Sequence, residues 1–122
     1  MKRIGVIGPT NAALIESRVG LADRTLEKAA REIGTFLAKN SFALVCVPAR
    51  GIGLWVLESY KEANGPDSLA LTPIGAEQPE DSREKMCRHA LMADWIRDDL
   101  TWGEEPVELA RVSDYLVAIG LS

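Results

Sequence analysis

An apolar run that ends in proline, arginine and two glycines most constrains how this chain can fold. Residues 42–47 (FALVCV) are all apolar and include two β-branched valines, which is typical of a strand buried on both faces. Pro48 cannot continue the strand because it has no N–H group to donate. Gly51 and Gly53 permit a tight turn into a helical pattern over residues 53–63. The helix would then point its unpaired N–H groups at the carboxyl end of the strand, where they attract anions such as phosphate.

Further strand and helix patterns alternate along the rest of the chain. The clearest helix, which Asp23 or Thr25 can cap, runs to about residue 39 with one apolar and one charged side, and its Gly34 is expected to pack closely on the sheet. Strands are predicted over residues 2–8, 68–75, 93–97 and 114–120, with helices over 105–112 and from residue 80, whereas residues 12–22 show no firm pattern. This alternation predicts a single three-layer α/β domain over residues 1–122, with a parallel sheet of about five strands.

Composition narrows the class of protein. The 122 residues are 47% apolar and 26% charged, as in an average globular domain, and the net charge is −4. An acidic chain is a poor partner for nucleic acid, whose binding requires a clustered basic face. Two cysteines do not make a disulfide framework, and no stretch is long and apolar enough for a membrane span or signal peptide. We therefore expect a cytoplasmic protein that binds neither nucleic acid nor membranes.

Several motifs occur in an order that is known from one family. They are KRIGVIG at residues 2–8, AAREIGTFLAKN at 29–40, ALVCVPARGIGLWVLESYKEANG at 43–65, LTPIG at 71–75 and SDYLVAIG at 113–120. This order resembles the lonely-guy and lysine-decarboxylase-like Rossmann proteins, which include molybdenum-cofactor carrier-like members. The resemblance covers most of the chain, and it implies a Rossmann-like fold and a nucleotide or another phosphate-bearing ligand.

Two departures from the family limit what the resemblance implies. The family's PGGxGT phosphate loop follows the SD strand, but here the sequence reads Ile119-Gly120-Leu121-Ser122 and ends where that loop would begin. Glu105 occupies the place of a family arginine before the SD pair, and Arg111 lies too close to Ser113 to replace it. The family's phosphoribohydrolase activity is therefore not carried over, and catalysis and cofactor remain unknown. Either the chain is a shortened relative, or a longer native chain has lost its C-terminal part.

The candidate ligand site follows from the predicted topology. In an open parallel sheet, ligands bind at the carboxyl ends of the strands. The turns and strand ends at that edge supply the candidate ligand-binding residues Gly8, Pro9, Thr10, Asn11, Arg50, Gly51, Ile52, Gly53, Gly75 and Gly120. Thr10 and Asn11 could bond a phosphate or a ribose, and Arg50 could bind a phosphate through two hydrogen bonds. The same residues also suit the turns that every doubly wound sheet requires.

Other chemistries are disfavoured. The G-I-G sequence lacks the third glycine of a dinucleotide fingerprint, because Val56 stands there, so a standard NAD site is not expected. His89 is the single histidine, and a lone histidine among charged residues is more often solvated than bound to a metal, so no metal site is predicted. Cys46 lies in the apolar run, where burial raises the pKa of a thiol and makes it a poor nucleophile.

Acidic pairs and tryptophans leave a second function open. The pairs Asp98-Asp99 and Glu104-Glu105 could support acid–base chemistry, but such neighbours more often form a solvated acidic surface. Trp55, Trp95 and Trp102 could mark a subunit interface, although core packing is the commoner role of tryptophan. The leading hypothesis is a protein that binds a nucleotide or another small phosphate-bearing molecule, with any chemistry being hydrolysis or transfer at a nucleotide. The alternative is a non-catalytic Rossmann-like module for self-association or partner binding, and a homo-oligomer is expected.

Overall fold

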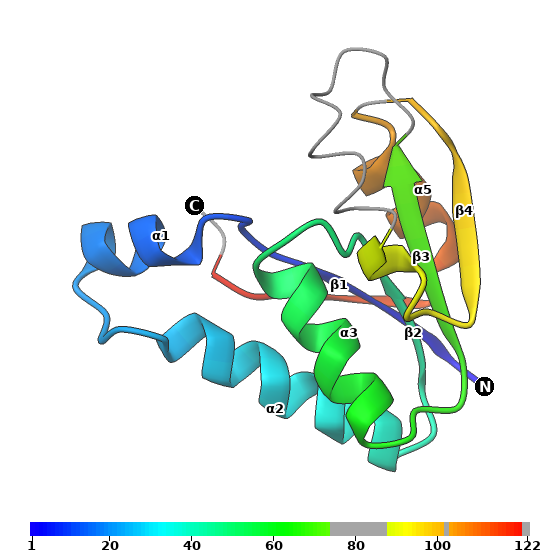
Figure 1. Ribbon diagram of the computed structural model, residues 1–122, viewed down its shortest axis with the longest axis horizontal. Coiled ribbons are helices and arrows are strands. Elements are labelled where there is room, and N and C mark those ends of the chain that lie inside the picture. The colour runs from blue at the N-terminus through cyan, green and yellow to red at the C-terminus, as the bar shows by residue number, and fades with distance from the viewer. Residues whose placement is uncertain (74–87, 102, 121–122) are drawn as a thin grey trace.

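Five parallel strands form one sheet in the computed structural model, which describes residues 1–73, 88–101 and 103–120 (Figure 1). The strands are β1 (Arg3–Ile7), β2 (Ala43–Cys46), β3 (Ser68–Pro73), β4 (Trp95–Leu100) and β5 (Tyr115–Ala118). The helices are α1 (Ala12–Val19), α2 (Thr25–Lys39), α3 (Ile52–Glu62) and α5 (Glu105–Val112). The strand order is β4-β3-β2-β1-β5, and every neighbouring pair is parallel. None of the helices in these residues is long and apolar enough to cross a membrane.

The sheet lies between two layers of helices. Helices α2 and α3 cover one face and α5 lies against the other (Figure 1). Successive side chains of β2 point to opposite faces of the sheet. Leu44 and Cys46 belong to the core cluster under α2 and α3, whereas Val45 packs with Leu109 of α5. All three of these β2 residues are buried, as expected for a central strand covered on both faces. The predicted α/β architecture with a five-stranded parallel sheet is confirmed.

Helix α1 forms in the stretch that the sequence pattern left unassigned. Asn11 caps it by accepting a hydrogen bond from the Leu14 N–H, at 3.4 Å. Its buried Glu16 accepts a hydrogen bond from the Leu26 N–H at 2.9 Å, and so satisfies an unpaired donor in the first turn of α2. This carboxylate, negative at the positive end of a helix, stabilises the contact between α1 and α2.

Two expectations about packing were wrong. Gly34 packs closely against α3 and not against the sheet. A Cβ atom built at this position would lie 2.0 Å from Ser59 Oγ and 2.4 Å from the Val56 carbonyl oxygen. The strand predicted over residues 114–120 was expected to be buried, yet Tyr115 is 60% and Leu116 49% exposed. The reason is that β5 is an edge strand, which pairs with β1 alone in the sheet.

The remaining expectations fall partly outside the described residues. The helix predicted from residue 80 lies among residues 74–87, and Trp102 is also outside them. Trp55 is half-buried and packs against the core under α2 and α3, as the commoner role of tryptophan predicts. Trp95 is largely exposed on β4, at the other edge of the sheet.

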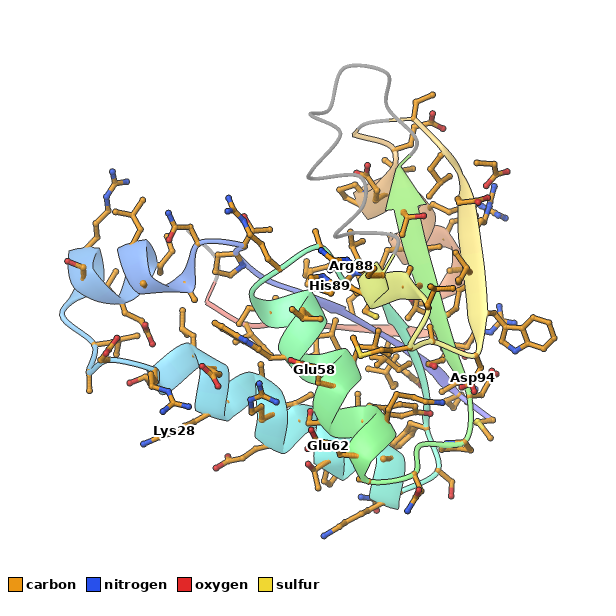
Figure 2. The ribbon with its side chains drawn as sticks, viewed as in Figure 1. Lys28, Glu58, Glu62, Arg88, His89 and Asp94 are labelled. Atoms are coloured by element: carbon orange, nitrogen blue, oxygen red, sulfur yellow. The ribbon has the colours of Figure 1, made fainter. Side chains whose placement is uncertain are left out.

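Asp94 connects the start of β3 to the segment before β4 (Figure 2). Its Oδ2 accepts hydrogen bonds from the Ser68 N–H and hydroxyl, both at 2.9 Å, and its Oδ1 accepts one from Lys61 Nζ at 2.9 Å. Partial burial opposes ionisation of Asp94, but the bonds from Lys61 and Ser68 outweigh it and lower the pKa of the carboxyl group. The carboxylate therefore stabilises the fold in its charged form.

Replacing this carboxylate, Asp94→Asn, is expected to lower the free energy of unfolding at pH 7 by about 1 kcal/mol. Because the folded state holds the pKa of Asp94 below its ordinary value, the wild type keeps this contribution above about pH 4. The contribution is lost as the pH falls through the lowered pKa, so the two proteins should converge in acid. Urea unfolding at several pH values tests this, with the exposed Asp98→Asn as the control. If the difference in free energy of unfolding between the wild type and Asp94→Asn stayed constant below pH 4, the stabilising role of the charged Asp94 carboxylate would be contradicted.

Candidate functional site

The carboxyl ends of β1 and β2 and the first turn of α5 enclose a pocket of about 370 Å³. Its volume lies within the range of small-molecule sites, which is roughly 300–1,000 Å³. The lining residues are Val6, Ile7, Gly8, Pro9, Thr10, Val47, Arg50, Gly53, Glu105, Pro106 and Leu109. The pocket thus lies at the edge of the sheet where open parallel sheets bind their ligands.

The turns after β1 and β2 are held against each other. The Ile52 N–H donates a hydrogen bond to the Pro9 carbonyl oxygen at 3.3 Å, across the two turns. Gly51 has a φ of +71°, and a side chain there would lie 2.6 Å from the same Pro9 oxygen, so both its conformation and its surroundings require glycine. These contacts fix Thr10 and Arg50 at one rim of the pocket.

The structure brings half of the predicted site residues together around this pocket. Those that line it are Gly8, Pro9, Thr10, Arg50 and Gly53. Gly51 and Ile52 lie immediately behind, with the Ile52 side chain fully buried in the core.

The other three predicted residues have different surroundings or no description. Asn11 caps α1 with its side chain. Gly120 faces α2, since a Cβ atom there would lie 3.0 Å from the Leu26 side chain. Gly75 lies outside the described residues.

The start of α3 presents hydrogen-bond donors at the pocket. The Ile52 N–H is already bonded, but among residues 1–73, 88–101 and 103–120 nothing accepts a hydrogen bond from the N–H groups of Gly53 and Leu54. Gly53 lines the pocket, and the exposed Arg50 precedes the helix at the same rim. Unpaired amides, a helix dipole and a guanidinium group together favour a negatively charged ligand group.

The α5 side of the pocket was missed by the sequence reasoning. Glu105 was expected on a solvated acidic surface, but it is only 8% exposed and lines the pocket with Pro106 and Leu109. Both of its carboxylate oxygens lie 3.2 Å from the Gly103 N–H. The signal that could have found it is Pro106, which suits the first turn of a helix. A crossover helix that precedes a parallel strand begins at the carboxyl edge of the sheet, so Glu105 had to lie near that edge.

The sequence suggested that His89 is solvated, but in the structure its side chain contacts the turn after β2. Its Nδ1 lies 2.8 Å from the Ala49 carbonyl oxygen and 3.1 Å from that of Pro48, and Figure 2 shows the side chain beside this turn. The ring can donate to one or both carbonyls only if Nδ1 carries the proton. Within the described part of the chain, no group of three histidine, cysteine or acidic side chains could hold a metal ion.

Cys46 is fully buried, and burial raises the pKa of its thiol to about 12. We therefore expect Cys46 in a Cys87→Ser background to remain unlabelled by a thiol reagent at pH 8 in the native state, and to react quickly in denaturant. Following the modification by mass spectrometry provides the measurement. Rapid labelling of the native protein would contradict the buried position.

No protein-family model and no curated protein matches the chain. Solved structures do match it. The Moco carrier protein from Chlamydomonas reinhardtii has a TM-score of 0.70 and 20% identity, over 99% of this chain and 63% of the carrier. The structural-genomics target TM1055 has a TM-score of 0.67 and 20% identity, over 97% of this chain and 60% of the target. The fold is Rossmann-like.

A more distant match has the same fold. DNA processing protein A from Helicobacter pylori, whose structure concerns single-stranded DNA binding, has a TM-score of 0.58 and 13% identity over 96% of this chain and 53% of its own. The chain spans about three-fifths of the length of the first structures that it matches. The Rossmann-like fold that the sequence resemblance implied is confirmed, and the molybdenum cofactor carriers named in that resemblance are among the similar structures.

Proposed function

We propose that this protein binds a nucleotide or another small phosphate-bearing molecule in the pocket at the carboxyl ends of β1 and β2. The observation that carries the proposal is that Arg50, Thr10 and Gly53 line one pocket of about 370 Å³, and that nothing in the described part of the chain accepts a hydrogen bond from the Gly53 N–H at the start of α3. These groups are donors and cations, as a phosphate requires. The similar structures named as molybdenum cofactor carriers also favour the binding of a small molecule over its conversion.

Thermal unfolding with inorganic phosphate and with nucleoside monophosphates tests the proposal. A ligand that binds only the folded state stabilises it by about 2.7 kcal/mol at a hundredfold excess over its Kd, so the melting temperature should rise with ligand concentration. Arg50→Ala should remove most of that rise. The matched control is Arg18→Ala, because Arg18 is exposed on α1 and does not line the pocket.

Two results would count against the proposal in different ways. If no phosphate-bearing compound raises the melting temperature of the wild type, the pocket is not a phosphate site. If Arg50→Ala responds like the wild type, a phosphate still binds but Arg50 takes no part. A loss of response in Arg18→Ala would mean that general surface charge attracts the anion, not the pocket.

Self-association is the second candidate function, and the edge strand β5 favours it. Tyr115 and Leu116 point to opposite faces of the sheet, and both are about half exposed or more. An exposed apolar edge strand is a template for pairing with another chain. Sedimentation over a wide range of protein concentration should show a dimer that Leu116→Lys dissociates, with Val107→Lys as the control at an exposed site on α5. A wild type that stays monomeric would exclude this function.

A further inference from the structure

We propose that Glu105 is the specificity-determining residue of the pocket, and that it binds the ribose hydroxyl groups of a nucleoside or sugar phosphate. This inference rests on the proposed function and adds the class of ligand and its orientation. The phosphate would lie beside Arg50 and the start of α3, and the sugar would face α5. The observation behind it is that two chemically opposite groups line one pocket.

The position of Glu105 is unusual for a carboxylate that serves the fold alone. Negative charge is favoured at the start of a helix, but an exposed side chain provides that benefit without desolvation. The preceding residue shows this arrangement, because Glu104 accepts hydrogen bonds from the Thr101 N–H and hydroxyl at the protein surface. Glu105 is instead more than nine-tenths buried and lines the pocket.

Within the part of the chain that the structure describes, the hydrogen bonds of Glu105 leave most of its acceptor capacity unused. A carboxylate offers about four acceptor sites, yet both oxygens share the single Gly103 N–H, each at 3.2 Å. No lysine, arginine or histidine among residues 1–73, 88–101 and 103–120 forms an ion pair with it. A buried carboxylate in this state favours a ligand that donates hydrogen bonds to it.

Arg50 and Glu105 line the same pocket and form no ion pair with each other, so they can bind different parts of one molecule. A phosphate beside Glu105 would meet a like charge in a partly buried site, which is unfavourable. Two neighbouring hydroxyl groups suit both carboxylate oxygens, and the charge strengthens each hydrogen bond. A ribose with free 2′ and 3′ hydroxyls supplies this pair at a short distance from its 5′-phosphate.

Calorimetric titration with AMP, 2′-deoxy-AMP and inorganic phosphate tests the inference. We expect the wild type to bind AMP about tenfold more tightly than 2′-deoxy-AMP, since loss of a charge-assisted hydrogen bond costs about that factor. Glu105→Gln should lose this preference because it binds AMP more weakly while its affinity for 2′-deoxy-AMP is unchanged. It should bind inorganic phosphate at least as tightly as the wild type. Glu104→Gln, which removes the neighbouring charge, should keep the preference.

The outcomes separate this inference from the proposed function. If the compounds bind but the wild type does not distinguish AMP from 2′-deoxy-AMP, the inference is overturned and the proposed function stands. Equal weakening of AMP and phosphate by Glu105→Gln would overturn it too, because that pattern indicates damage to the pocket. If no compound binds, both fail. Should Glu105→Gln not fold, as judged by circular dichroism, the comparison of the two nucleotides on the wild type still decides.

Discussion

Replacing Gly34 with alanine is expected to lower the free energy of unfolding by about 2 kcal/mol, even though alanine is the better helix former by about 1 kcal/mol. The reason is the close approach of α2 to α3. The new methyl carbon would lie 2.0 Å from Ser59 Oγ and 2.4 Å from the Val56 carbonyl oxygen, and ordinary contacts are well above 3 Å. The hydroxyl can rotate away, but a backbone carbonyl cannot, so the two helices must separate.

A double variant distinguishes these two contacts. Ser59→Ala removes the hydroxyl and leaves the Val56 carbonyl, so it should restore only part of the stability that Gly34→Ala loses. Urea unfolding of the wild type, the two single variants and the double variant gives the coupling free energy between positions 34 and 59 directly. Glu32→Ala on the exposed side of α2 is the control, and it should change the free energy by less than about 0.5 kcal/mol. A Gly34→Ala protein as stable as the wild type would mean that the helices pack less closely than described.

The sheet was largely predictable from the sequence because its signals are local. The apolar run at β2 and the glycine turn after it identify a buried strand and a helix without knowledge of the rest of the chain. Helix α5 was also predicted with its observed bounds, because Pro106 fixes its start. Helix α1 was not predictable in this way. Its Asn11 cap is local, but the carboxylate of Glu16 bonds an amide ten residues away in α2, and no periodic pattern records that contact.

Packing between elements limited the prediction of the site and of burial. The turns after β1 and β2 could be placed at one edge of the sheet, because parallel strands end on the same side. Pro106 could have placed both Glu104 and Glu105 near that edge, but the sequence does not show which of these adjacent carboxylates is buried at the pocket and which is exposed to solvent. The exposure of β5 had the same cause. The apolar sequence of β5 predicts a buried strand, and only the strand order shows that β5 lies at an edge of the sheet.

Replacing Gly53 with alanine is expected to affect both stability and ligand binding, with a loss of about 2 to 3 kcal/mol in the free energy of unfolding. A methyl carbon at this position would lie 2.1 Å from the Val47 carbonyl oxygen and 2.9 Å from its carbon. Both atoms belong to the backbone at the end of β2, so no side chain can turn aside. The first turn of α3 would have to move away from the strand, and the N–H groups of Gly53 and Leu54 would move with it.

The consequence for the site can be measured separately from the loss of stability. Under conditions where Gly53→Ala remains folded, inorganic phosphate and AMP should raise its melting temperature much less than that of the wild type. Gly20→Ala is the matched control, because a Cβ atom at Gly20 meets nothing within 4 Å and the cost is only the left-handed backbone, about 1 kcal/mol. That variant should be slightly less stable yet respond normally to phosphate. If phosphate raised the melting temperature of Gly53→Ala as much as that of Gly20→Ala, the start of α3 would not form part of the phosphate site. Displacing its N–H groups must weaken the binding of any anion that they contact.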